Sequence, residues 1–187
     1  MRKFYLICLL ILIFSVQGFA LDIGGVKIPD SLSVSGTDLQ LNGAGIRTKV
    51  VIKVYAGALY LQNRTSDFNV IMNADEKMAI RLHFIYDGGV DGIKLQEAWN
   101  EGFKNAAVNT AGLKKEIDQF NSYFKKKAMK NDIYDITYSP EEGMSVIINN
   151  TLMGRIPGKE FKKAVFGIWL SEKTALPVLR KAMLGIK

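Results

Sequence analysis

The sequence predicts a single α+β domain, an open-faced sandwich in which helices are layered on one face of an antiparallel sheet. Two observations lead to this prediction. Stretches of alternating apolar and polar residues are separated by short turn sequences, which is typical of antiparallel strands. Two amphipathic helices follow each other in the middle of the chain, and their apolar faces need a sheet to cover. No internal repeat, linker or low-complexity tract divides the sequence.

Residues 1–20 have the pattern of a cleaved signal peptide, so we expect the domain to comprise residues 21–187. Arg2 and Lys3 precede an apolar core at residues 4–16, and small residues precede the expected cleavage point. An uncleaved membrane anchor is the alternative, but the apolar run is shorter than the roughly 20 residues of a spanning helix. Cleavage predicts a periplasmic or secreted protein.

The first half of the domain is expected to be mainly strand. Two short edge strands come first, joined by a polar, serine-rich connection, and a long apolar strand follows. Ser66 or Asp67 can cap a short helix, because either side chain can accept a hydrogen bond from the first free amides. The expected elements are strands at 26–29, 39–41 and 46–62, a short helix ending at residue 73, and a strand at 78–86.

The second half combines helices with a three-stranded meander. Asp91 can cap a helix whose apolar residues recur at helical spacing, and a second such helix follows Gly112. Residues 140–143 and 149–150 supply the turns of the meander. Pro177 fits the first turn of the last helix. The expected elements are helices at 91–106 and 113–124, strands at 133–138, 144–148 and 151–156, and helices at 161–170 and 175–184.

One arginine lies between a glycine-rich bend and an apolar strand, in the stretch LNGAGIRTKVVIKVYAGALYL at residues 41–61. Alternation over residues 50–61 gives two faces that are both largely apolar, as in a central strand covered on each side. Arg47 is therefore expected to lie close to the interior. Because a buried cation without a partner is destabilising, an acidic side chain or an acidic ligand should lie beside it.

Three segments resemble the chalcone isomerase-like proteins, and specifically their bacterial exported branch. The segments are GAGIRT, KVYAGALYL and FKKAVFGIWL, and the resemblance covers the chain from about Leu21 to its end. It implies an antiparallel sheet with helices on one side, which agrees with the pattern of elements. The family includes plant isomerases and fatty-acid-binding relatives, so the resemblance is more specific for the fold than for an activity.

Several kinds of chemistry lack the residues they need. The only cysteine, Cys8, lies in the expected signal peptide, and the only histidine, His83, has no ligand-spaced neighbours. We therefore expect no metal, no cofactor and no serine or cysteine triad. The net charge of +7 is too dispersed to indicate nucleic acid. The lysines at 125–127 and 130 are interpreted as a solvated helix end, with contact to anionic lipid headgroups as the alternative.

Arg47 and a tyrosine are suited to holding one carboxylate or phenolate at the mouth of an apolar pocket. A guanidinium can form two parallel hydrogen bonds with a carboxylate, and a tyrosine hydroxyl can donate a third. Tyr55 is the first candidate for this tyrosine, and Tyr60 is the second. An uninterrupted strand would separate Arg47 from Tyr55 by roughly 26 Å, so the clamp needs a bend. Residues 48–52 show no turn signal, and an internal acidic partner for Arg47 is the alternative.

The resemblance also implies positions for the isomerase site. Arg47 matches the family arginine, and Asn105 matches an asparagine of the central helix. The catalytic threonine falls on Tyr55, a tyrosine of the central helix falls near Trp99, and a late serine or threonine falls near Ile168. The missing hydroxyls would stabilise a developing enolate, so their loss makes isomerase activity on flavonoid precursors doubtful.

We therefore expect an exported binding protein without catalysis, whose partner is a small apolar ligand with an acidic group. Trp99 and Trp169 are candidates for the lining of its pocket, and Asn105 for a polar contact. The first alternative is an intramolecular lyase or isomerase that uses Arg47 and Asn105. The second is a structural or partner-binding protein whose core is filled, because lining and packing residues have the same composition.

Overall fold

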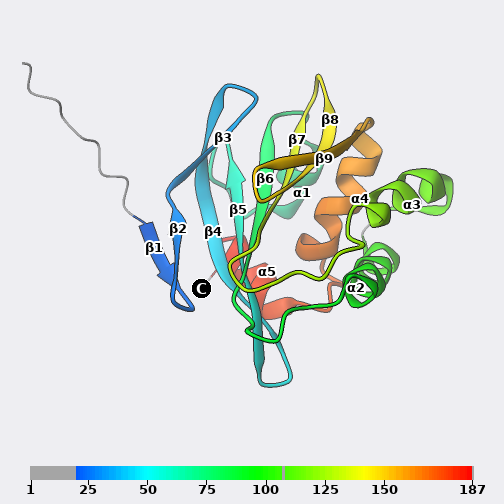
Figure 1. Cartoon of the computed structure of the whole chain (residues 1–187). Coiled ribbons are helices and arrows are strands. Elements are labelled where there is room, and N and C mark those ends of the chain that lie inside the picture. Colours follow the sequence, from blue (N-terminus) through cyan, green and yellow to red (C-terminus); the bar gives the residue numbers. More distant parts are fainter. Residues whose placement is uncertain (1–19, 107, 187) are drawn as a thin grey trace, which may run out of the picture.

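Seven antiparallel strands form one sheet, and their order in space follows their order in the chain (Figure 1). The computed structural model describes residues 20–106 and 108–186. The expected signal peptide, apart from its last residue, lies outside this range. The strands of the sheet are β3 (Ser31–Val34), β4 (Thr37–Lys49), β5 (Ile52–Leu61), β6 (Met78–Phe84), β7 (Ile133–Ser139), β8 (Gly143–Ile148) and β9 (Thr151–Ile156).

Helices cover one face of this sheet, and a separate β1–β2 hairpin lies on the opposite face (Figure 1). The predicted α+β architecture is thereby confirmed. No helix within the described ranges is long and apolar enough to cross a membrane. The remaining elements are β1 (Ala20–Ile23), β2 (Val26–Pro29), α1 (Phe68–Asn73), α2 (Gly92–Asn105), the 3-10 turn η1 (Ala111–Leu113), α3 (Lys114–Ser122), α4 (Lys159–Leu170) and α5 (Pro177–Met183).

Alternation along β5 divides the interior into two clusters. Tyr55 and Leu59 point towards the helices and join the larger core, which includes the aromatic residues of α2 and α4. Ala58 and Tyr60 point to the other face and pack under β2 and β3. Burial on both faces is expected for a strand in the middle of a covered sheet, and it makes β5 the centre of the fold.

The single long strand predicted at residues 46–62 is wrong, because the chain reverses at Val50 and Val51 to form the β4–β5 hairpin. Lys49 pairs with Ile52 across this turn. Val50 has a φ of 58°, a left-handed conformation that β-branched residues rarely adopt. Turns of this length are normally signalled by glycine, asparagine or aspartate, so a turn of two valines left no trace in the sequence.

The glycines of the GAG segment bring β4 into close contact with α5. A Cβ atom on Gly43 would overlap the backbone carbonyl oxygen of Ala182, and one on Gly45 would lie 2.6 Å from the Ala182 Cβ. Both glycines are therefore needed for this close approach. Because Arg47 follows Gly45 on the same face of β4, the position of α5 leaves this arginine just beyond the helix.

Smaller differences concern short elements. Strands β1 and β3 were not predicted, and β3 occupies part of the connection expected to be irregular. Helix α3 ends at Ser122, so Phe124 belongs to the segment that follows it. Helix α1 begins after Asp67, whose carboxylate accepts hydrogen bonds from the amides of Asn69 and Val70, as the capping argument predicted.

A fully buried lysine of α4 closes the end of α1. The Lys162 Nζ donates to the backbone carbonyls of Ile71, Met72 and Ala74 at 2.9, 3.0 and 2.8 Å. These carbonyls lie at the C-terminus of α1, where helical acceptors lack partners and a cation is favoured. The three hydrogen bonds fix α1 against the helical layer.

Candidate functional site

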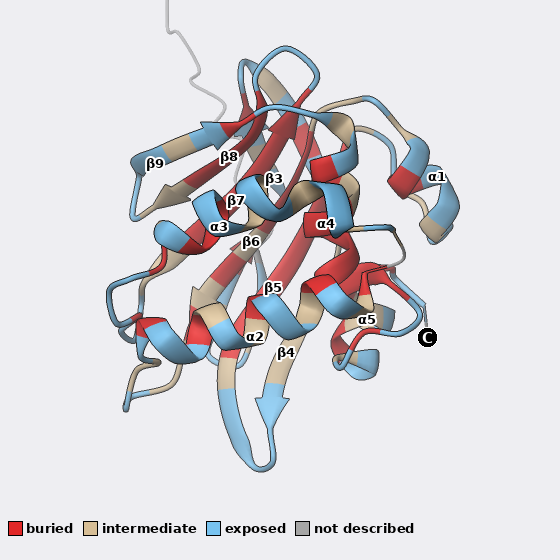
Figure 2. Cartoon of the chain, turned by 90° about the vertical axis from the view of Figure 1, so that its right-hand side faces the viewer, coloured by how far each residue is buried: buried red, intermediate tan, exposed pale blue. Residues whose placement is uncertain are grey.

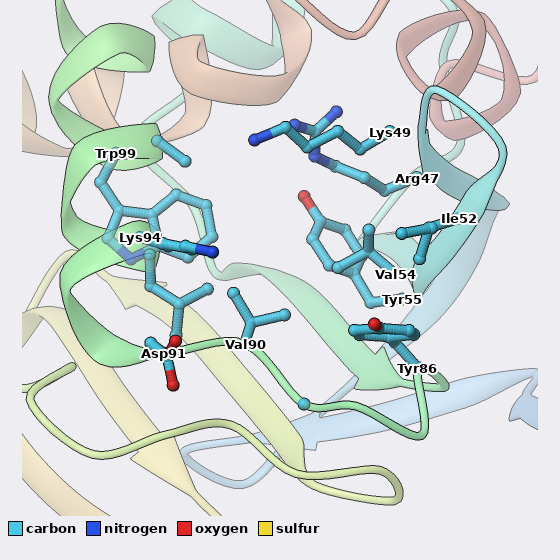
Figure 3. A pocket seen from close by; sticks show the side chains of 13 residues that line it. Arg47, Lys49, Ile52, Val54, Tyr55, Tyr86, Val90, Asp91, Lys94 and Trp99 are labelled. Carbon is cyan, nitrogen blue, oxygen red and sulfur yellow. The ribbon is translucent and has the colours of Figure 1, made fainter.

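A cavity of about 310 Å³ opens between the end of the β4–β5 hairpin and the first half of α2 (Figure 3). Arg47, Lys49 and Tyr55 line it from the hairpin. Lys94 and Trp99 line it from α2, and the loop after β6 closes the third side. Three separate segments of the chain therefore meet at this site.

Arg47 and Tyr55 are direct cross-strand partners at the cavity. The register shifts between Arg47 and Thr48, so Val54 is an extra residue, a bulge, on β5. The backbone amides of Ile85 and Tyr86 both donate to the Val54 carbonyl. Opposed residues of an antiparallel pair point to the same face, so both side chains face the helices. In Figure 3 the Tyr55 hydroxyl points towards the guanidinium group. The bend that the clamp required is therefore present.

The Tyr55 hydroxyl is held as a neutral donor. Its Oη accepts a hydrogen bond of 3.0 Å from Trp169 Nε1, so its own proton is left to be donated elsewhere. Burial raises the pKa of Tyr55 to about 12, against the opposing effects of the Arg47 charge and the Trp169 hydrogen bond. At neutral pH this side chain can therefore donate to an anion but cannot itself become one.

Three cationic side chains converge on the cavity from two walls (Figure 3). Across the described residues, no carboxylate lies within ion-pair distance of Arg47, Lys49 or Lys94. Asp91, the acidic residue of the lining, lies 3.8 Å from Lys127 instead. The described residues therefore include no internal acidic partner for Arg47. The positive charge around the cavity is suited to an acidic ligand.

The rest of the wall is apolar. Val54, Val90 and Leu95 line the cavity together with the indole of Trp99. The Trp99 ring is almost fully buried and packs against Trp169 with 5.3 Å between ring centroids. Its Nε1 is buried without an acceptor among the described residues. A cationic and hydroxyl-bearing side facing an apolar wall is the usual design of a site for a ligand with one acidic end.

Three of the predicted site residues lie elsewhere. Tyr60 faces the opposite side of the sheet, where its hydroxyl donates to the carbonyl of Pro29 at 2.9 Å. Trp169 is fully buried behind Tyr55 and supports that hydroxyl rather than lining the cavity. Asn105 is at the last turn of α2 and is not part of the cavity lining; its carbonyl accepts from the Ser171 hydroxyl.

Ile168 takes the place where the resemblance implied a hydroxyl. Its side chain is buried and packs against Gly102 so closely that a Cβ on this glycine would lie 2.5 Å from the Ile168 Cγ2. Ile168 also borders a smaller cavity of about 40 Å³ that shares Arg47 and Tyr55 with the main one. The packing of Ile168 against Gly102 is therefore tight, although Glu101 and Thr174 also line the smaller cavity.

The structure adds site residues that sequence reasoning missed. Lys49 could have been predicted from the sequence, because it lies two residues from Arg47 and so shares its face of the strand. Lys94 and Leu95 lie in the helix predicted after Asp91. Nothing in the sequence indicated that this end of the helix, and not the other, would lie near Arg47. Tyr86 lies in a loop whose position depends on the bulge at Val54.

No group of histidine, cysteine, aspartate or glutamate side chains suited to a metal ion occurs in the described part of the chain. His83 is half-buried on β6, and burial together with the nearby Arg81 lowers its pKa. Arg81 itself forms a two-point ion pair with Asp135, at 2.7 and 2.8 Å, on the face of the sheet away from the cavity. These polar residues belong to the packing of the outer face.

Comparisons with known proteins agree with this architecture. The chalcone isomerase-like family matches residues 20–185, and the chain therefore belongs to that family. Among solved structures, a fatty-acid binding protein of Arabidopsis thaliana has a similar fold, with a TM-score of 0.68 and 22% identity over 86% of this chain and 92% of the other. A search of curated proteins gives no match.

Proposed function

We propose that the protein is an exported binding protein that holds a small apolar ligand by its acidic group and does not transform it. The observation that carries this proposal is Arg47, which has no ion-pair partner among the described residues and lies beside Tyr55 at an open, mainly apolar cavity. Export is supported by the basic start and apolar core of the first 20 residues. The similar fold of a fatty-acid binding protein also favours a small apolar ligand.

The acidic group of the ligand is assigned to the Arg47 side of the cavity. The guanidinium offers parallel donors to a carboxylate, and the free Tyr55 proton adds a neutral donor from the neighbouring strand. Lys49 and Lys94 contribute charge from the rim. The apolar part of the ligand then lies against Val90, Leu95 and the Trp99 ring, where burial of its hydrocarbon supplies affinity.

The size of the cavity favours a short ligand. Small-molecule sites commonly span about 300–1,000 Å³, so a cavity of about 310 Å³ lies at the lower end of this range. A medium-chain carboxylate or a phenolic acid is therefore a better match than a long-chain fatty acid. Lys49 and Ile52 belong to both the lining and the exposed hairpin end, so a longer chain would have to leave the cavity there.

Binding is preferred over isomerisation because two of the hydroxyls that the resemblance implied are missing. Tyr55 keeps a hydroxyl at the threonine position, but Trp99 and Ile168 stand where the other two were implied. Asn105 lies outside the cavity lining. Fewer donors are thus available to stabilise an enolate in the transition state.

Native mass spectrometry of the exported protein tests this proposal. We expect the wild type to retain a carboxylic acid of low mass, and Arg47→Ala to lose it while keeping its melting temperature. Arg64→Ala is the matched control, because Arg64 is exposed and outside the cavity. Preparations that never contain a ligand would favour a filled core and a structural role. Turnover of a chalcone that is lost in Arg47→Ala would favour the isomerase.

A further inference from the structure

The end of the β4–β5 hairpin is an exposed apolar surface beside the cavity. Val50 and Val51 are 91% and 85% exposed, and Ile52 is 41% exposed. Figure 2 shows this hairpin projecting beyond the rest of the sheet. Ile93, in the first turn of α2, is 71% exposed and lies next to Lys94 on the opposite wall of the cavity. Apolar side chains are thus exposed on both sides of the cavity mouth.

A valine occupies the hairpin end although the backbone conformation there is unfavourable for a branched side chain. Val50 has a positive φ, a conformation in which the branched Cβ is strained and asparagine or glycine is favoured. An exposed position gives the valine no packing in return. An outlier of this kind points to a role for the apolar side chain outside the folded domain.

Cations surround this apolar end. Lys49 and Lys53 flank the turn on the two strands and are exposed, and Lys94 is exposed across the cavity. None of the three forms an ion pair with another described residue. Their charges are therefore available to an external partner.

The lysine-rich segment after α3 extends the same basic surface. Ala128 forms a β-bridge with Val90 of the cavity wall, which brings Lys125, Lys126 and Lys127 to this side of the molecule. Lys127 lies 3.8 Å from Asp91, and the other two form no ion pair within the described ranges. Through Lys127, the lysine cluster therefore adjoins Asp91 of the cavity wall.

We propose that this surface docks on a membrane containing anionic lipids, with Val50, Val51 and Ile52 inserted at the headgroup boundary. An apolar projection surrounded by lysines matches the two attractions that hold a protein at such an interface, burial of apolar groups and charge attraction to anionic headgroups. In this orientation the cavity opens towards the bilayer. The docking depends on surface residues alone and does not require a ligand in the cavity.

Vesicle co-sedimentation of the exported protein tests this inference. We expect binding to vesicles of phosphatidylcholine with phosphatidylglycerol, little binding to phosphatidylcholine alone, and weaker binding at high salt. In the variant Val50→Asn/Val51→Gly, asparagine tolerates the positive φ of residue 50 and glycine accepts any backbone conformation, so the melting temperature should be retained. The variant should nevertheless bind the anionic vesicles at least about tenfold more weakly, since two valines are no longer buried in lipid.

Charge variants and a distant control complete the test. Lys53→Gln and Lys126→Gln should each weaken binding about fivefold, as expected for one basic residue near an anionic surface. Val70→Asn, at an exposed position of α1, should leave binding unchanged. A wild type that ignores anionic vesicles, or a Val50→Asn/Val51→Gly variant that binds as well as wild type, would overturn the proposal.

Insertion of the hairpin can be observed separately. Cys8, the only cysteine of the sequence, is removed with the expected signal peptide, so Val51→Cys in the exported protein accepts a single polarity-sensitive dye. We expect its emission to shift to shorter wavelength on anionic vesicles, while a dye at Val70→Cys does not shift. Equal responses at both positions would show that the hairpin end does not enter the lipid and would overturn the proposed mode.

Discussion

Arg47 on β4 and Tyr55 on β5 lie directly opposite each other, and both side chains face the cavity beneath α2. The tight turn at Val50 and Val51 creates this pairing, and the bulge at Val54 sets its register. Tyr55 in turn accepts a hydrogen bond from Trp169 of α4. A cationic donor and a neutral donor are thereby positioned side by side from the centre of the sheet.

Replacing Tyr55 by phenylalanine should weaken both the fold and ligand binding. The buried Trp169 Nε1 would lose its acceptor, which costs about 1–3 kcal/mol of unfolding free energy. Affinity for a carboxylic acid should fall about fivefold to tenfold with the loss of one neutral hydrogen bond. Chemical denaturation and calorimetric titration measure the two effects.

Tyr60→Phe is the matched control for that substitution. Tyr60 is equally buried on the same strand but faces the other side, where it donates to Pro29. This variant should lose stability and retain full affinity. An affinity loss as large as that of Tyr55→Phe would show that the hydroxyl on the cavity side has no special role.

High pH should destabilise the protein through Tyr55. Its pKa is about 12 in the fold and about 10 in the unfolded chain, so the unfolded state releases its proton first. The contribution of Tyr55 to the free energy of unfolding is fully present below about pH 10. It falls by about 2–3 kcal/mol as the pH rises to about 12. Unfolding free energies measured across this interval should fall less in Tyr55→Phe than in wild type. Parallel curves would contradict the assignment.

Enlarging Ala98 should shorten the ligands that the protein accepts. Ala98 lines the cavity from α2 beside Trp99, and leucine is a good helix former at this half-buried position. Ala98→Leu should reduce affinity for the longest bound carboxylate at least about tenfold, since the added groups occupy the space of the ligand's hydrocarbon. Affinity for a short acid such as butanoate should change little. A titration series over chain length measures this, and an unchanged profile would place the ligand elsewhere.

Removing the buried amine of Lys162 should destabilise the helical layer. Lys162→Met leaves three carbonyls at the end of α1 without their donor, and each buried acceptor without a partner costs about 1–3 kcal/mol. Lys163→Met is the control, because this neighbour pairs with Glu160 at the surface and should change stability by less than about 0.5 kcal/mol. Thermal and urea unfolding compare the two variants. Equal effects would show that the hydrogen bonds to α1 contribute little.

Much of the fold followed from local patterns. The meander at the C-terminal half and the helix after Asp91 could be predicted because alternation, helical spacing and turn residues all agree there. The hairpin at Val50 could not, since neither valine favours the conformation that the turn imposes. The strand was therefore predicted as continuous, and the distance between Arg47 and Tyr55 was overestimated.

The candidate site, too, could be predicted only in part from the sequence. Arg47 was recognisable as a charge in an apolar setting, and Tyr55 and Trp99 as its aromatic neighbours. Tyr60 and Trp169 were chosen on residue type, but the sheet face of one and the burial of the other behind Tyr55 depend on tertiary packing. Lys94 reaches the cavity because α2 crosses the sheet at this end, which no local pattern determines.

The most direct test of the account is a calorimetric comparison of decanoate with decanol on wild type and Arg47→Ala. A charge-assisted hydrogen bond contributes about 1.5–3 kcal/mol, so wild type should bind the acid about 10–100 times more tightly than the alcohol. Arg47→Ala should lose most of this preference while its affinity for decanol stays the same. Equal binding of acid and alcohol by wild type, or a preference that survives in full without Arg47, would contradict the account.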